Sequence, residues 1–549
     1  MPLDLLITGR IATLAGRAGF GWVEAIGVRD GRIAFAGSEI ELETRADPFT
    51  RRIALAPDEV AIPGLTDAHL HLAQAARALH QVDLTGTATI EAGMAKVADA
   101  HAALADPDAW LDGHGWSADR WGRWPTAADL ERVAPGRRVT LWAHDHHALL
   151  ASHAALRTGD VSGETPDPAG GVIRRGPDGS PEGVLYETAA RLVSIHVPAS
   201  EQSDLETDIE TVGRELVSLG LVACHDPAGL APDPDLTFSY PAYTHLAETG
   251  RLPVRLHASV RSDGLDSAIA RGIRSGAVLG ADPTGRARVG WQKCFADGSL
   301  GSRTAALLDD IEPESDQPLP PERRRGVWIT PPEELAALAT RAAAAGIATQ
   351  IHAIGDAAAR AALDVLIPTA AGVPLMPRLE HVQLVQPADL VRFASGGVAA
   401  SVQPVHVGSD AIVARQLWGS RAETNGYPWA SLARTGAILA FGTDAPVESF
   451  DPWPGIALAV RREDPRWPAG TPRFGPHEEI SLDRALRAAC LDPALSAREM
   501  DRGRLMPGHR ADVVVLDAAV LDDPVEPGGA LATARPALVL MDGEVVFER

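Results

Sequence analysis

The sequence contains few cysteines, three in 549 residues, and none of them belongs to a Cys-x-x-Cys pair. An odd number of widely spaced cysteines argues against a disulfide framework and favours a reducing compartment. The amino terminus lacks a basic segment followed by a long apolar run, so we expect no signal peptide. No apolar stretch reaches the length of a membrane span. These absences together favour a cytoplasmic protein that does not enter a membrane.

Positive charge is also scarce, since the formal net charge is −23 and the pI is about 5.2. An acidic surface repels polyanions, which argues against nucleic acid and membranes as partners and favours a small-molecule substrate. Lysine is nearly absent, because Lys96 and Lys293 are the two lysines among 50 basic residues. Arginine serves wherever a fixed cation is needed, so a retained lysine is a candidate for a task that requires loss of its proton. Chance is the alternative, and it must explain Lys96 in any case.

The two ends of the chain have a β-rich pattern. Short apolar runs are separated by turn signals such as Asp30-Gly31 and Asp542-Gly543, which predict strands and hairpins. We expect residues 1–60 and 503–549 to pair into one small β-sandwich. The region between them, 61–502, is long enough for a large barrel.

This middle region alternates strand-like and helix-like segments, as βα units do. Eight candidate strands occur at residues 59–72, 221–227, 251–260, 287–298, 347–356, 377–385, 397–407 and 438–446. Eight βα units predict an α/β fold, a (β/α)8 barrel of the TIM type, whose active site lies at the C-terminal ends of the strands.

A long segment separates the first two candidate strands. It is too long for a plain loop and therefore predicts an inserted subdomain at about residues 73–205. Five tryptophans fall within it: Trp110, Trp116, Trp121, Trp124 and Trp142. They suit an apolar lid over a substrate, although ordinary core packing explains most of them better.

The strongest local signal is His69-Leu70-His71, at the end of the first candidate strand. Side chains alternate across a strand, so residues i and i+2 face the same way. Both imidazoles are therefore expected to point into the barrel mouth and reach one metal ion. An isolated His-x-His pair is a weak signal, but the preceding segment, residues 63–68 (PGLTDA), strengthens it.

Four further residues occupy comparable places. Lys293 lies late in the fourth candidate strand, where a neutral lysine that reacts with CO2 forms a carbamate able to bridge two metal ions. The ordinary alternative is a barrel lysine paired with a carboxylate such as Asp297. His352, His381 and Asp444 end the fifth, sixth and eighth candidate strands, and each alone is explained by core packing or helix capping. Their shared position favours one catalytic site.

These motifs identify a resemblance. The segments PGLTDAHLHL, QKCFADGSLGSRTA, IHAIGDAA, LEHVQLV and FGTDAPV resemble those of the amidohydrolase superfamily, in the branch that includes N-substituted formamide deformylase. The stretches GWSADRWGRWPTAADL and residues 503–517 are similar to that branch as well. The resemblance spans nearly the whole chain and implies a metal-dependent hydrolase that cleaves a non-peptide C–N bond.

The resemblance also implies individual roles. His69 and His71 would bind the more buried metal, and Lys293, carboxylated, would contribute to the metal site. His352 and His381 would serve a second metal position or the substrate. Asp444 would bind metal and act as general base and proton shuttle. Imidazole and carboxylate ligands suit zinc, in one or two ions, with iron or manganese as alternatives.

The expected substrate contacts are Arg303, His225 and Trp116, and His146 and His147 are candidates to reach the site from the insert. A structural ion pair is the alternative for Arg303. The favoured reaction is hydrolysis of an amide or N-formyl bond by a metal-activated water. A cyclic amidase or a deaminase is the enzymatic alternative, and a non-catalytic barrel scaffold is the alternative of another class. Members of the superfamily are often dimers, so a homodimer is a further expectation.

Overall fold

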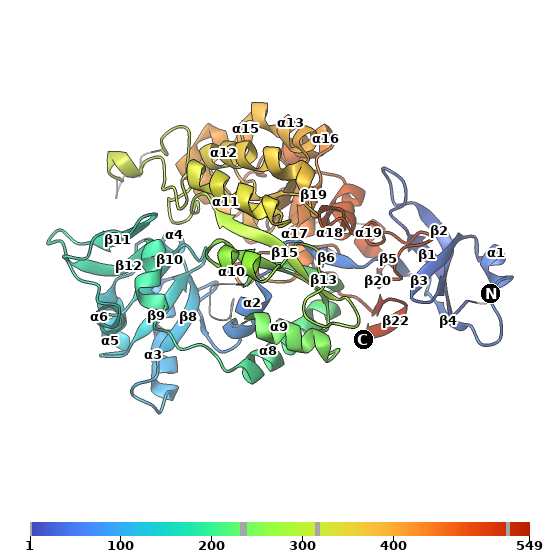
Figure 1. The fold of residues 1–549 in the computed structure, drawn as a ribbon, viewed down its shortest axis with the longest axis horizontal. Helices are drawn as coiled ribbons and strands as arrows, with labels where there is room; N and C mark the ends of the chain where they lie inside the picture. The colour runs from blue at the N-terminus through green and yellow to red at the C-terminus, as the bar shows by residue number, and fades with distance from the viewer. Residues whose placement is uncertain (1–2, 231–238, 313–318, 523–527) are drawn as a thin grey trace.

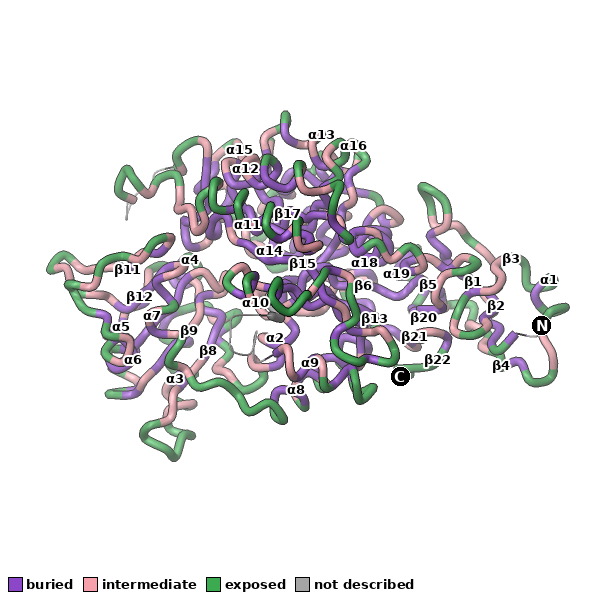
Figure 2. The backbone as a smooth tube through the Cα atoms, viewed as in Figure 1, coloured by how far each residue is buried: buried purple, intermediate pink, exposed green. Residues whose placement is uncertain are grey.

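The structure, a computed structural model, describes residues 3–230, 239–312, 319–522 and 528–549. The strands within these ranges form three sheets, two of eight strands and one of six. Figure 1 shows the barrel in the centre, the six-stranded sheet at one end and most of the third sheet at the other. Buried backbone concentrates where the elements of each part pack together (Figure 2).

The central sheet is a parallel barrel of eight strands that follow one another in chain order. They are β6 (Leu65–Asp67), β13 (Leu221–Leu230), β14 (Arg255–Arg261), β15 (Ala287–Phe295), β16 (Thr349–Ala353), β17 (Arg378–His381), β18 (Ala399–Val402) and β19 (Leu439–Phe441). The first and last strands meet through the Ala68 amide, which donates to the Phe441 carbonyl oxygen at 2.8 Å. Eight parallel strands in this order confirm the predicted α/β barrel.

Helices follow the barrel strands and turn apolar faces to the barrel. They include α8 (Gln202–Ser218), α9 (Ser239–Glu248), α11 (Pro332–Ala344), α12 (Asp356–Leu366), α13 (Pro387–Gly396), α16 (Trp429–Thr435) and α18 (Leu482–Ser496). In α12 the buried residues Ala359, Leu363 and Leu366 recur at helical spacing, which places one face on the core. Among the described helices, none combines the length and apolarity needed to cross a membrane.

Both ends of the chain contribute to the second eight-stranded sheet. Its strands are β1 (Leu5–Ala12), β2 (Trp22–Arg29), β3 (Arg32–Gly37), β4 (Arg51–Ala54), β5 (Glu59–Pro63), β20 (Val513–Asp517), β21 (Leu538–Met541) and β22 (Glu544–Glu548). The two ends join where β5 pairs antiparallel with β20. A buried ion pair, Arg255 to Asp512 at 2.9 Å, ties this sheet to the barrel. The sandwich form and the domain boundaries stay predictions.

The insert between β6 and β13 contains a six-stranded sheet with its own apolar core. The strands are β7 (Val82–Asp83), β8 (Leu111–Trp116), β9 (Val139–Ala143), β10 (Ala148–Ala151), β11 (Gly171–Arg175) and β12 (Pro181–Glu187). Helix α3 (Ile90–Ala103) and helix α5 (Ala127–Val133) accompany this sheet. Trp116 and Trp121 belong to the core of the insert. All six strands fall within the predicted range 73–205.

The first predicted strand, 59–72, requires a correction because it is two strands in two different sheets. It breaks at Gly64, between β5 of the terminal sheet and β6 of the barrel. A Cβ at Gly64 would lie 2.7 Å from a methyl group of Val222, so a side chain does not fit where the chain passes between the sheets. β6 ends at Asp67, and therefore His69 and His71 lie beyond the strand.

The close contact between the segments after β6 and β19 predicts that substitution of Gly442 destabilises the protein. A Cβ at Gly442 would lie 2.5 Å from the His69 backbone nitrogen, in a place where neither chain has room to move. We expect Gly442→Ala to destabilise the protein by at least about 1–3 kcal/mol, the usual cost of overpacking. Gly372→Ala is the matched control, since a Cβ there meets no atom within 4 Å. Thermal unfolding checks this, and equal midpoints for the two variants would contradict it.

Candidate metal centre

His69 and His71 lie in the loop that follows β6, and His71 precedes the first residue of α2 (Leu72–Ala78). Their convergence therefore does not come from strand alternation, which corrects the sequence argument. It comes from two backbone hydrogen bonds across the barrel seam, the place where the segments that follow β6 and β19 meet. The Asp444 amide donates to the His69 carbonyl oxygen at 2.7 Å, and the His71 amide donates to the Ala445 carbonyl oxygen at 2.9 Å.

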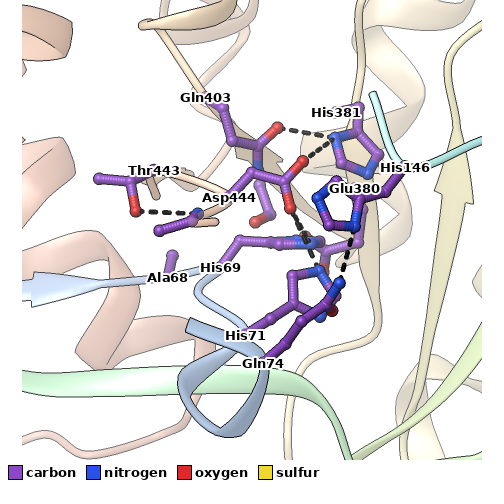
Figure 3. A network of polar contacts seen from close by, with 12 residues as sticks. Ala68, His69, His71, Gln74, His146, Glu380, His381, Gln403, Thr443 and Asp444 are labelled. Carbon is purple, nitrogen blue, oxygen red and sulfur yellow. Dashed lines mark hydrogen bonds and ion pairs between the residues drawn. The ribbon is translucent and has the colours of Figure 1, made fainter. Parts of the chain in front are cut away.

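Asp444 occupies the centre of the site (Figure 3). It lies three residues beyond the end of β19, with a backbone φ of 63° in the left-handed region that non-glycine residues seldom adopt. One carboxylate oxygen, Oδ1, is 3.3 Å from His69 Nε2 and 3.2 Å from His71 Nε2. The other, Oδ2, is 3.5 Å from His406 Nε2 and 4.0 Å from His381 Nδ1. A helix-capping role does not describe this placement.

Two groups of three ligand-type side chains share this aspartate. His69, His71 and Asp444 form one, and His381, His406 and Asp444 form the other, each with ligand atoms within 4.8 Å of one another. His406, the first residue of α14 (His406–Trp418), was not singled out by the sequence analysis. Its position near the end of the seventh candidate strand was the signal that could have identified it.

A set of buried polar residues holds the two histidine groups in place. Glu380 Oε2 lies 2.6 Å from His69 Nδ1, and Arg378 in turn donates to Glu380. Gln403 Oε1 lies 2.9 Å from His381 Nδ1. Bonding at Nδ1 of His69 leaves its Nε2 free to face Asp444, as the carboxylate–histidine pairs of metal proteins do.

The charge states of these groups suit a cation. Burial raises the pKa of Asp444, but His69 and the neighbouring histidines outweigh it and hold this pKa well below its usual range. Burial lowers the pKa of His352 and of His381 well below the usual histidine value. The site therefore presents an ionised carboxylate beside the neutral imidazole of His381, the forms in which these side chains bind metal. Burial lowers the pKa of His69, but the charges of Glu380 and Asp444 outweigh it and raise this pKa.

Unsatisfied nitrogen atoms provide a test of fit. His71 Nδ1 and His406 Nε2 are buried without a hydrogen-bond partner among the described residues. Buried polar atoms without partners are rare in proteins and require an explanation. A divalent ion beside Asp444 would bind the His406 nitrogen, and imidazole nitrogens with a carboxylate oxygen are the ligands that zinc prefers. The residues present thus fit a metal ion.

Lys293 and His352 line the same cavity but belong to neither three-residue group. Lys293 is buried near the end of β15, with Nζ 4.7 Å from the centre of the Phe295 ring. Asp297, its alternative partner, instead accepts hydrogen bonds from the amides of Ala306, Ile354 and Gly355. His352 Nε2 lies 3.1 Å from the Gly298 carbonyl oxygen.

The centre lies in a cavity of about 1300 Å³ between the barrel mouth and the insert. The insert contributes Trp116, Trp124, Trp142, His146 and His147 to its lining. Burial lowers the pKa of His146 to about 3. The pKa of His147 is raised to about 9 because Glu187, at 2.7 Å, outweighs burial.

Of the three predicted substrate contacts, Trp116 lines this cavity, whereas Arg303 and His225 do not. The Arg303 guanidinium pairs with Asp119 of the insert at 2.5 and 3.0 Å, which favours the alternative of a structural ion pair. His225 is buried inside the barrel, where its Nδ1 accepts a hydrogen bond from Arg378 at 2.9 Å. Through Arg378 it acts on Glu380 rather than on the cavity.

Comparison with known proteins identifies the family of this chain. Residues 56–547 match the model of the amidohydrolase family, and the chain belongs to that family. It is 30% identical to the protein LONG AFTER FAR-RED 3 of Arabidopsis thaliana, covering 95% of this chain and 88% of the relative. It is 28% identical to the N-substituted formamide deformylase of Arthrobacter pascens, covering 99% and 98%.

A solved structure shares the architecture. An uncharacterised metal-dependent hydrolase from Pyrococcus furiosus superposes with a TM-score of 0.69 at 26% identity, covering 95% of this chain and 100% of its own. Family, fold and site together define the chain as a metal-dependent hydrolase that acts on carbon–nitrogen bonds.

The contact between Glu380 and His69 predicts an effect on metal affinity. We expect Glu380→Gln to weaken metal binding by about 10–100-fold, because the neutral amide orients and polarises His69 less strongly. Titration of chelator-stripped protein with Zn²⁺ measures this. The control is Glu478→Gln, another buried glutamate, which bonds to Ser431 outside the site. If Glu380→Gln binds Zn²⁺ as tightly as Glu478→Gln does, Glu380 does not support His69 as a metal ligand.

Proposed function

We propose that the chain hydrolyses a non-peptide amide or N-formyl C–N bond with a metal-activated water. The observation that carries the proposal is the convergence of four histidines on Asp444 at the mouth of the barrel. Likeness to a relative named for N-substituted formamides supports the acyl specificity. The tryptophans along the insert side of the cavity suit an apolar or aromatic substituent on the nitrogen.

The metal would be zinc, in one or two ions, with iron or manganese as alternatives. His69, His71 and Asp444 would hold one ion, and His381 with His406 would hold a second. His352 and Lys293 line the same cavity and would contribute further ligands. A bound divalent ion supplies a water of lowered pKa and polarises the carbonyl oxygen.

Asp444 is the proposed general base and proton shuttle. Its carboxylate is ionised at neutral pH and lies between the two histidine groups, so it can accept the proton of the attacking water. As the water oxygen bonds to the carbonyl carbon, the proton moves to Asp444. The same proton then passes to the departing nitrogen as the C–N bond breaks, which regenerates the carboxylate.

Lys293 is the proposed site of carboxylation. Burial lowers the pKa of its ammonium group to about 8, which makes the neutral amine accessible near neutral pH. The amine nitrogen would bond to the carbon of CO2 and lose a proton, giving a carbamate anion. That anion would bring two oxygen ligands to the cavity where Lys293 already lies.

A substrate screen tests the proposed function. Metal-replete enzyme is assayed on N-substituted formamides, N-acylated amines, cyclic amides and aminopurines, with metal content measured on the same sample. We expect turnover of a linear acyl substrate and a loss of about 10²–10⁴-fold in Asp444→Asn, which lacks the base. Ammonia release from aminopurines alone would favour a deaminase. Full turnover by a metal-loaded Asp444→Asn variant would reject the mechanism.

Carboxylation of Lys293 predicts a response to bicarbonate. Chelator-stripped protein in CO2-depleted buffer should bind Zn²⁺ more tightly when bicarbonate is added, because carbamate formation completes the ligand set. Lys293→Arg keeps the charge but cannot form the carbamate, so its affinity should not change with bicarbonate. Lys96→Arg, at the other lysine, should respond as the wild type does. A wild-type affinity independent of bicarbonate would contradict carboxylation.

A further inference from the structure

His146 stands out among the cavity residues that the proposed function leaves unused. It lies in the turn between β9 and β10 of the insert, with a backbone φ of 56°. A non-glycine residue in the left-handed region persists where its surroundings over-determine it, and such residues cluster at functional sites. The turn directs the His146 side chain into the cavity that holds His71 and Asp444.

The hydrogen bonding of the ring fixes its tautomer. Gln74, on α2, has its amide nitrogen 2.7 Å from His146 Nδ1. An amide NH2 donates only, so Nδ1 accepts, and the single proton of the neutral ring lies on Nε2. Trp142 stacks on the ring, with 3° between the planes and 6.1 Å between the centroids. Gln74 thus holds the edge of the His146 ring, and Trp142 holds one face.

The proton on Nε2 has no acceptor within the described part of the protein, although the atom is buried. His146 lines the same cavity as His71 and Asp444. Figure 3 shows the ring between Gln74 and the Asp444 side chain. A buried, oriented donor that faces a catalytic carboxylate and lacks an acceptor indicates a ligand that supplies one.

We propose that His146 Nε2–H donates a hydrogen bond to the carbonyl oxygen of the acyl group whose C–N bond is cleaved. This inference rests on the proposed function. The carbonyl oxygen gains negative charge as water adds to its carbon, so a donor already held in place binds the transition state more strongly than the substrate. The insert then supplies a catalytic residue as well as a wall of the cavity.

Two substitutions test the donor. His146→Leu removes it, and we expect kcat to fall by about 10²–10³-fold with KM and metal content little changed, as for other single oxyanion donors. His146→Gln places an amide N–H at a similar reach and should recover most of that loss. The control is His153→Leu, at an exposed histidine of the insert at the start of α6 (His153–Thr158), which should behave as the wild type.

The outcomes separate the two proposals. A wild type that hydrolyses none of the acyl substrates rejects the proposed function, and the role of His146 with it. If the wild type is active and His146→Leu has the same kcat, the proposed role of His146 is rejected and the proposed function stands. Equal losses in the Leu and Gln variants, with metal bound and unfolding midpoints retained, also reject it, because they assign His146 to packing.

Discussion

Closure of the barrel between its first and last strands is the constraint on which the site depends. The chain after β6 and the chain after β19 lie so close that Gly442 has no room for a side chain. Asp67 joins the two segments, since its carboxylate accepts hydrogen bonds from the amides of His69 and Thr443 and from the Thr443 hydroxyl. The same seam therefore places His69 and His71 against Asp444, and the candidate metal centre is a consequence of closure.

The polar residues around the seam serve one electrostatic purpose. A carboxylate and several imidazoles are taken out of water together, which is unfavourable unless each has a partner. Arg378 and Glu380 satisfy His69 from within the barrel, and Gln403 satisfies His381. Among the described residues, His406 Nε2 and His146 Nε2 are buried without hydrogen-bond partners beside the cavity, where a metal ion and a substrate would complete them. The insert extends this arrangement with the oriented ring of His146.

The sequence predicted the barrel and four of the five residues that converge in the candidate centre, because βα repetition and position at strand ends are local signals. It attributed the convergence of His69 and His71 to strand alternation, which is wrong, because the sequence does not show that the strand ends at Asp67 and a loop begins. It missed His406 and the support from Glu380, whose roles depend on contacts between distant segments. The Arg303 partner lies 184 residues away, at Asp119, a pairing that a single sequence does not encode visibly.

Anomalous diffraction from crystals of zinc-loaded enzyme tests the central claim most directly. The account predicts a peak bounded by the imidazoles of His69 and His71 and the carboxylate of Asp444, with any second peak beside His381 and His406. A well-ordered crystal in which zinc binds away from Asp444, or does not bind at all, would contradict the claim that barrel closure builds the metal centre.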